Sequence, residues 1–290
     1  MATGNTTTSS LADSLEDVIM SARIIREQEG GMAQLVEQQI LERGKGTGWT
    51  EITYDKLTAQ AITETTELDN PQQVSDTSRT IIPTVVGIQT IITDRVAARI
   101  TPKGFAKIGA LAQNAIQRKK DQDGLTVLDG FSNSYCGAGS TLTSGHIGAA
   151  KALISGNATE PGNPPYRGVL HSYQIHDIED EIIAGVGTYP VAEGLTARVF
   201  KEGFRGMINM VQLYENGNIT IDADDDAKGG VFAQEAIILV QGRTPWIETK
   251  RAPQTGGGAT ELFQYDEYAY GERKDDWGVE IYSDATAPTS

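Results

Sequence analysis

The chain has 290 residues, of which 39% are hydrophobic and 22% are charged, as is ordinary for a folded protein with a sizeable core. Its formal net charge of −15 argues against a surface that grips phosphate backbones, because such binding needs clustered Lys and Arg. Cys136 is its one cysteine, so no intrachain disulfide is possible. Neither a signal-peptide pattern nor an apolar run near the ~20 residues of a membrane span occurs, so membrane segments are not expected.

Two thin helices are predicted near the N-terminus. In the first, Leu15 and Ile19 belong to an apolar stripe at helical spacing, and Gly30 ends the pattern. A second short helix is predicted over residues 32–41, before a run of glycines. Neither helix can bury a core alone, so we expect this segment to be an arm that lies across another surface.

A threonine-rich segment follows, at residues 50–93. Threonine is β-branched and suits a pleated surface. Apolar residues recur at period two from Ile82 through Val86 to Ile92, and a weaker limb begins at Ile52. The polar turn 68–73 lies between the limbs. We therefore predict a long two-stranded excursion, which has to pack on a neighbouring subunit because an isolated hairpin is marginal in water.

The remaining pattern mixes helices and strands. Thr93 is predicted to cap a short helix, and Pro102 to open a long amphipathic helix that continues to Leu128. Further helices are predicted over 144–154 and from Ser172 onward. Because the strands do not alternate regularly with helices, the fold class is α+β. Strands are predicted at 169–171, 197–201, 206–214, 218–221, 231–240 and 260–269.

The candidate catalytic and metal-binding residues are few. His171 and His176 with Asp177 are the best metal candidate, but the i,i+5 spacing does not align two histidines on a helix. The acidic run 222–226 lacks the glycine and glutamate of a calcium loop. Cys136 has no local histidine partner. We predict a protein that is not an enzyme and has no cofactor or metal site, and we keep a metal-dependent enzyme at His171 and His176 as an alternative.

The order of segments is the most informative feature: thin arm, long excursion, amphipathic helix, then a mixed region. This order resembles the Hong Kong 97-type fold of tailed-bacteriophage major capsid proteins. Local sequence adds to the resemblance in the stretches 164–174 (PPYRGVLHSYQ), 204–206, 230–236 and 270–279. The branch that these stretches resemble often has proline where this chain has Ser172.

The resemblance implies a structural subunit of an icosahedral phage head, built from pentamers and hexamers that enclose double-stranded DNA. The acidic subunit would touch that DNA only non-specifically. The implied locations are the virion capsid and, during assembly, the host cytoplasm. The implied parts are an N-terminal arm (1–47), an extended loop (48–93), a peripheral domain with a spine helix (94–134 and 241–290) and an axial domain (135–240).

The implied partners are other copies of the chain, together with portal and decoration proteins. Because the sequence reaches the predicted arm almost at once, we also expect a separate scaffolding protein. Nine residues are predicted as contacts between subunits: Leu15, Ile19, Arg79, Ile82, Val86, Arg95, Arg99, Trp246 and Glu248.

Two other functions stay open beside the metal-dependent enzyme. An encapsulin-type bacterial compartment shares the implied fold but encloses cargo protein instead of DNA. A non-viral binding protein could use the threonine-rich strands to engage a surface partner, although the missing signal peptide weakens an extracellular role.

Overall fold

We describe the protein from a computed structural model. The structure describes residues 5–6, 30–42, 44, 46–65, 68, 71–99, 102–186 and 206–288, and for 5–6, 102–106 and 182–186 we describe the backbone alone. The predicted first arm helix, with Leu15 and Ile19, and the predicted strand 197–201 lie outside the described residues. In the described part, no helix is long and apolar enough to cross a membrane.

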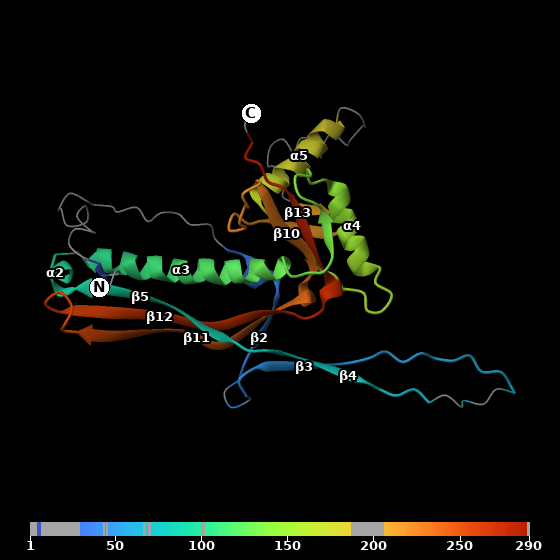
Figure 1. Cartoon of the computed structure of the whole chain (residues 1–290), viewed down its shortest axis with the longest axis horizontal. Helices are drawn as coiled ribbons and strands as arrows, with labels where there is room; N and C mark the ends of the chain where they lie inside the picture. The colour runs from blue at the N-terminus through green and yellow to red at the C-terminus, as the bar shows by residue number, and fades with distance from the viewer. Residues whose placement is uncertain are drawn as a thin grey trace.

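A long sheet and one long helix form the lower half of the molecule in Figure 1. Within the described residues this sheet has five strands in the order β1-β5-β12-β11-β2, and the spine helix α3 (Pro102–Leu128) lies along one of its faces. The short helix α2 leads from β5 toward α3. The bounds are β1 Asn5–Thr6, β2 Glu37–Ile40, β5 Thr84–Thr93, α2 Asp94–Ala97, β11 Ile237–Ala252 and β12 Ala259–Glu272.

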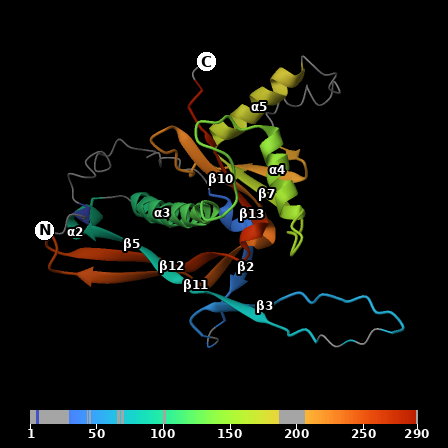
Figure 2. The ribbon, with the colours of Figure 1, turned by 45° about the vertical axis from the view of Figure 1, so that its right-hand side comes forward.

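A second sheet forms the upper half, and Figure 2 shows it from another side with the helices α4 and α5 beside it. Its described strands follow the order β6-β13-β10-β7-β9-β8. The bounds are β6 Ser134–Cys136, α4 Ser144–Ser155, β7 Tyr166–Leu170, α5 Ser172–Val186, β8 Met207–Ile208, β9 Val211–Glu215, β10 Asp226–Ala233, β13 Gly278–Asp284, and the 3-10 turns η2 Gln234–Ala236 and η3 Asp275–Trp277.

One apolar core joins the two halves. Leu128, at the end of α3, is fully buried and packs over Gly230 of β10, where a Cβ would lie 3.2 Å from the Leu128 side chain. Phe232 and Ile281 from the upper sheet belong to the same cluster. Met32 also joins it, so the chain that follows the N-terminal segment is anchored to the core.

The Asp121 carboxylate strengthens that anchor. It is buried on α3 and accepts hydrogen bonds from the Met32 backbone N–H (2.9 Å) and from the side-chain amides of Asn216 (2.8 Å) and Asn218 (2.9 Å). Gly30 lies so close that a Cβ there would be 2.3 Å from Asp121 Cβ. One carboxylate therefore ties α3, the residues after the N-terminal segment and the loop after β9 together.

A β-hairpin projects from the body. Its strands β3 (Trp49–Tyr54) and β4 (Asp76–Ile81) pair in antiparallel register, from Trp49 opposite Ile81 to Tyr54 opposite Asp76. In Figures 1 and 2 the hairpin extends away from both sheets. A two-stranded hairpin is therefore present as predicted, but it spans residues 49–81 instead of 50–93.

The partner of one predicted strand was wrong. The period-two segment ending at Ile92 is β5, and it does not pair with β3. It pairs with β12 over ten residues, from Thr84 opposite Tyr268 to Thr93 opposite Ala259. Alternation of apolar residues predicts a strand but does not identify the strand beside it. Any neighbouring strand can supply the backbone hydrogen bonds.

Two shorter predictions were also wrong. Residues 32–41 form a one-turn helix, α1 (Met32–Leu35), and then the strand β2, which pairs in parallel with β11. The backbone hydrogen bonds that β2 makes along the edge of β11 outweigh the weak helix propensity of this short polar segment. Residues 218–221 form a turn in which only Ile221 makes a bridge, to Ala227. The predictions for α2, α3, α4, α5 and the strand at 169–171 are confirmed.

Candidate assembly surfaces

The outer part of the hairpin exposes apolar side chains. Ile52 and Tyr54 on β3 are 54% and 68% exposed. In the connecting segment, Leu57, Ile62 and Val74 are also more than half exposed. Exposed apolar residues gathered on a projecting hairpin mark an interaction surface. Their exposure to water is unfavourable, and the hairpin has little apolar core of its own in which to bury them.

The base of the hairpin, in contrast, is packed. Ile81 is 8% exposed and clusters with the buried Ile238 and Val240 of β11. Trp49 and Leu41 are half-buried against the same cluster. The hairpin is thus fixed where it leaves the body and solvated farther out.

Arg273 holds this base electrostatically. Its Nε donates to Glu51 Oε2 of β3 at 2.7 Å, and Nη2 contacts the other oxygen of that carboxylate. Nη1 donates to Glu37 Oε2 of β2 at 2.9 Å. Hydrogen bonding to Glu51 raises the pKa of Arg273 further above its ordinary value. A single guanidinium at the end of β12 therefore joins the hairpin and β2.

Arg79, a predicted contact between subunits, contacts its own chain. Its Nη1 donates to the backbone carbonyl of Glu272 and lies 3.2 Å from Glu272 Oε1. Its side chain stays 48% exposed, so an intrachain role at the hairpin base leaves part of the guanidinium accessible. Whether it also contacts a second subunit stays a prediction.

The long sheet has two different faces. On β12, Asp266 and Tyr268 face α3, where they bond Lys120 (3.1 Å) and Asp123 (2.9 Å). Side chains alternate along a strand, so Phe263 and Tyr265 point to the opposite face. There the Tyr265 ring packs over Gly87, where a Cβ would lie 2.5 Å from the ring.

Trp246 belongs to this second face, because it is paired with Tyr265 across the ladder and their ring centroids are 5.1 Å apart. The Arg243 guanidinium lies 4.0 Å from the Trp246 ring, and the Trp246 indole N–H donates to Glu248 Oε1 at 3.2 Å. Trp246 and Glu248 were both predicted as contacts, and the structure places them together.

The other predicted contacts are scattered. Ile82 is 58% exposed just after the hairpin, and Arg95 and Arg99 are exposed at the far end of the long sheet. Val86 is partly buried and packs against the main core, as a residue on the α3 side of β5 would. These roles stay predictions. Sequence reasoning missed Arg273 and Tyr265, whose partners are distant in the chain, and also Phe263, which stacks on Tyr265.

The two candidate metal-binding histidines do not converge. His171 Nδ1 accepts a hydrogen bond from the Tyr173 backbone N–H at 3.2 Å, and burial lowers the pKa of His171. His176 Nε2 instead lies 3.7 Å from Asp180. Across the residues that the structure describes, no group of three or more His, Cys, Asp or Glu side chains is arranged to hold a metal ion.

The acidic run forms a turn that bonds to itself. Asp222 Oδ1 accepts from the backbone N–H groups of Asp224 and Asp226, both at 2.9 Å, and its Oδ2 accepts from the Tyr282 hydroxyl at 3.0 Å. Hydrogen bonding from the Asp226 backbone is the main cause that lowers the pKa of Asp222. These contacts explain the acidic residues as turn-forming groups.

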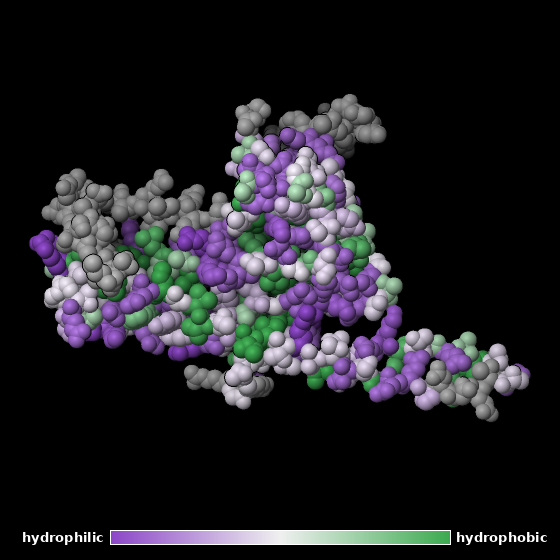
Figure 3. All heavy atoms as spheres, viewed as in Figure 1, coloured by the Kyte–Doolittle hydropathy of each residue, from purple (hydrophilic) through white to green (hydrophobic). Residues whose placement is uncertain are grey.

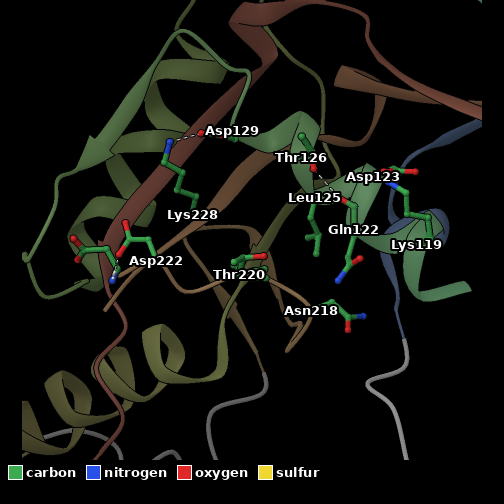
Figure 4. A pocket seen from close by; sticks show the side chains of 12 residues that line it. Lys119, Gln122, Asp123, Leu125, Thr126, Asp129, Asn218, Thr220, Asp222 and Lys228 are labelled. Atoms are coloured by element: carbon green, nitrogen blue, oxygen red, sulfur yellow. Dashed lines mark hydrogen bonds and ion pairs between the residues drawn. The ribbon is translucent and has the colours of Figure 1, made fainter. Parts of the chain in front are cut away.

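A cavity of about 500 Å³ lies between α3 and this turn (Figure 4). Its two lysines are already neutralised, because Lys119 lies 2.5 Å from Asp123 and Lys228 contacts Asp129. The remaining lining residues supply amides, hydroxyls and apolar groups, among them Gln122, Thr126 and Leu125.

Solved structures share this arrangement over almost the whole chain. The cyanophage Pam1 capsid matches at a TM-score of 0.71 and 13% identity, over 99% of this chain and 100% of that chain. The capsid of Helicobacter pylori bacteriophage KHP30 matches at a TM-score of 0.73 and 11% identity, over 97% and 98%. The capsid of cyanophage P-SCSP1u matches at 0.70 and 11%, over 97% and 96%. The chain has a phage-capsid fold.

The phage-capsid fold confirms the predicted α+β, Hong Kong 97-type architecture. At 11 to 13% identity the similarity lies in the fold and not in the sequence. No protein-family model matches the chain, and no curated protein is similar to it in sequence.

Proposed function

We propose that this chain is a major capsid protein, a structural subunit that assembles with copies of itself into the icosahedral head of a tailed phage. The observation that carries the proposal is the phage-capsid fold over 97 to 99% of the chain in three capsids. A match of this extent includes the hairpin and both sheets and is not limited to one common motif.

The exposed surfaces support self-assembly. The hairpin places Ile52, Tyr54 and Leu57 in water, and the half-buried Trp246 and Tyr265 lie on the face of the long sheet away from α3. Obligate interfaces bury more than about 2,000 Å² and are more apolar than the rest of a protein surface. Contact with other copies would bury these groups, and this burial stabilises the subunit within a shell.

The role is structural and not enzymatic. The candidate residues His171 and His176 have separate partners, and the lysines of the 500 Å³ cavity are already paired with aspartates. The proposed partners are other copies of the chain, a scaffolding protein, and portal and decoration proteins. The proposed locations are the virion capsid and the host cytoplasm during assembly. Packaged double-stranded DNA meets the acidic subunit only non-specifically.

Negative-stain electron microscopy of the recombinant protein tests this proposal, with the protein expressed alone and together with its neighbouring genes. We expect polyhedral shells or rings of five and six subunits. An encapsulin-type compartment is the alternative with the same fold. Its shells would contain a protein cargo, and its gene would have no portal or packaging genes beside it. A monomer under every condition would contradict both.

A further inference from the structure

We propose that Lys120 of α3 selects the register between β11 and β12, because it neutralises the buried Asp266 and so keeps Arg243 on the other face of the sheet. The inference goes beyond the proposed shell function, since it concerns how a single chain selects the shape of its long sheet before any assembly.

The two strands change register part-way along their ladder. In the inner half Gln241 lies opposite Tyr268, whereas in the outer half Trp246 lies opposite Tyr265. Five steps along β11 are thus matched by three steps along β12, so β11 holds two additional residues at this point. From Trp246 to Ala252 the ladder is regular again.

The apolar pattern of β11 does not select this offset. Side chains alternate along a strand, so a shift of the outer half by two residues leaves each outer side chain on its own face. The inner half is fixed, because Ile237 and Ile238 are fully buried there. If the inner register continued outward, Glu248 would lie opposite Glu261, where Lys250 now lies. A different interaction has to distinguish the two registers.

One charged residue changes face between the two registers. Arg243 lies opposite Glu267, and its guanidinium is 4.0 Å from the Trp246 ring, on the face away from α3. In the continued inner register Arg243 would lie opposite Asp266, whose side chain faces α3. The guanidinium would then enter the buried space between the sheet and the helix.

Lys120 occupies that space. Its Nζ lies 3.1 Å from Asp266 Oδ2, donates to Gln241 Oε1 at 2.7 Å, and lies 4.8 Å from the centre of the Tyr268 ring. Gln241 Nε2 donates to Asp266 Oδ1 at 2.5 Å and to the backbone carbonyl of Arg243 at 2.9 Å. One amide group therefore joins the buried ion pair to the backbone at the offset.

The ion pair is withdrawn from water. Asp266 is 0% exposed and Lys120 is 8% exposed. Figure 3 shows hydrophilic residues on the outside of this half of the molecule, where water solvates them, whereas the pair lies beneath the surface. A buried carboxylate needs a cation, but a second cation beside the first is unfavourable. Lys120 therefore excludes Arg243, and a buried ion pair of this kind specifies register even where it adds little stability.

Disulfide formation in the full-length chain reports which register is present. Every protein carries Cys136→Ser and one of two cysteine pairs. Lys250→Cys with Glu261→Cys reports the observed register, and Glu248→Cys with Glu261→Cys reports the shifted register. The Cα atoms of a disulfide lie about 4.4 to 6.8 Å apart, which suits residues directly opposite each other and not residues two places along. Both pairs replace Glu261, so its charge does not influence the comparison.

The key variant is Lys120→Met, which leaves Asp266 without its cation. With Lys120 present, we expect the observed-register pair to oxidise at least about tenfold faster than the shifted pair. In Lys120→Met we expect Arg243 to take the place beside Asp266, so that the shifted pair becomes the faster one by at least about threefold. Circular dichroism establishes folding before oxidation, and denaturing gels separate intrachain from interchain disulfides.

Two further variants isolate the cause. Lys120→Met with Arg243→Met removes both cations, so it should not favour the shifted pair, and it should lower the urea midpoint by more than the two single substitutions together. The matched control is Gln264→Met, at another buried polar residue of β12, which donates to the Gly109 carbonyl of α3 at 3.3 Å. This control should leave the ratio of the two oxidation rates unchanged.

The inference is overturned by a folded Lys120→Met protein that keeps the observed register, or by a Gln264→Met protein that shifts in the same way. Failure of Lys120→Met to fold, or additive effects of the Lys120 and Arg243 substitutions on the urea midpoint, would also contradict it, because Arg243 would then not have replaced the lost cation. None of these measurements requires shells, so failure of the proposed shell function is a separate outcome.

Discussion

Arg273 shows how one side chain can set the position of a large element. Its guanidinium bonds Glu51 on the hairpin and Glu37 on β2, and it is only 24% exposed. Hydrogen bonds to charged groups contribute about 1.5 to 3 kcal/mol each when they are shielded from water. The angle at which the hairpin leaves the body therefore depends on this residue.

We expect Arg273→Gln to lower the free energy of unfolding by about 1 to 3 kcal/mol, because two half-buried carboxylates lose their cation. Urea unfolding measures the loss, and hydrogen exchange should show faster exchange in β3. The control is Lys250→Gln, which removes an exposed cation and should change stability by less than about 0.5 kcal/mol. Equal effects of the two substitutions would contradict the clamp.

Asp121 is the second residue on which several segments depend. An Asp121→Ala variant leaves the Met32 backbone N–H and the Asn216 amide without an acceptor in a buried site. We expect a loss of about 2 to 4 kcal/mol, measured by urea unfolding. Gln113→Ala, on an exposed position of the same helix, serves as the control and should be nearly neutral. A neutral Asp121→Ala would show that this carboxylate does not hold the segment after residue 29.

The Asp129–Lys228 pair gives a pH-dependent effect. Burial opposes ionisation of Asp129, but the hydrogen bond from Lys228 and the positive charge of Lys228 help to outweigh it, so the pKa of Asp129 falls below the ordinary 3.8. A group with a lowered folded-state pKa stabilises the protein above its unfolded pKa, and this contribution is lost as pH falls through the folded pKa.

We therefore expect Asp129→Asn to be less stable than the unsubstituted chain at pH 6, with a difference below about 1 kcal/mol because the Asp129 side chain is 47% exposed. The difference should shrink as the pH approaches 3. Urea unfolding at several pH values measures it, and a difference that grows in acid would contradict the assignment.

At the scale of elements, the hairpin is separable from the body, whereas β5 is not. The hairpin strands pair only with each other, and Trp49 lies directly opposite Ile81. In contrast, β5 pairs with β12 over ten residues and borders the core. The hairpin and β5 are consecutive in the chain and so resemble one excursion in the sequence. Only β5 contributes to the stability of the body.

We expect replacement of residues 50–80 by a short Gly-Asn-Gly turn to leave a folded body that cannot form shells. Circular dichroism and thermal unfolding measure folding, and ultracentrifugation measures assembly. A deletion of residues 50–92 is the comparison, and it should unfold because it also removes β5. Normal shells from the shorter replacement would refute the role of the hairpin.

The same elements show what the sequence could predict. The spine helix was predicted over its full length because its apolar stripe is long and is opened by Pro102. The strand β5 was predicted as a strand and given the wrong partner, since period two determines faces and not neighbours. The short β2 was predicted as helix because the edge it pairs with lies about 200 residues later in the chain.

Some residues of the candidate surfaces could be named from the sequence, and others could not. Trp246, Glu248, Arg95 and Arg99 could be named as exposed polar or aromatic residues, and the structure places them on the surface of the long sheet and at its far end. Arg273 could not be recognised, because its value comes from Glu37 and Glu51, more than 200 residues away. Long-range charge partners have no local signal in a single sequence.

At the scale of the whole molecule, shape and surface chemistry agree. The hairpin projects from an elongated body, and exposed apolar side chains gather on it. This arrangement is unfavourable in a monomer. In an assembly where each copy contacts one neighbour on either side, such groups are covered.

Negative-stain electron microscopy of the recombinant protein, alone and co-expressed with its neighbouring genes, tests the central claim most directly. The account predicts uniform polyhedral shells or rings of five and six subunits. A folded protein that stays monomeric in every one of these conditions would contradict the claim that this phage-capsid fold builds a shell.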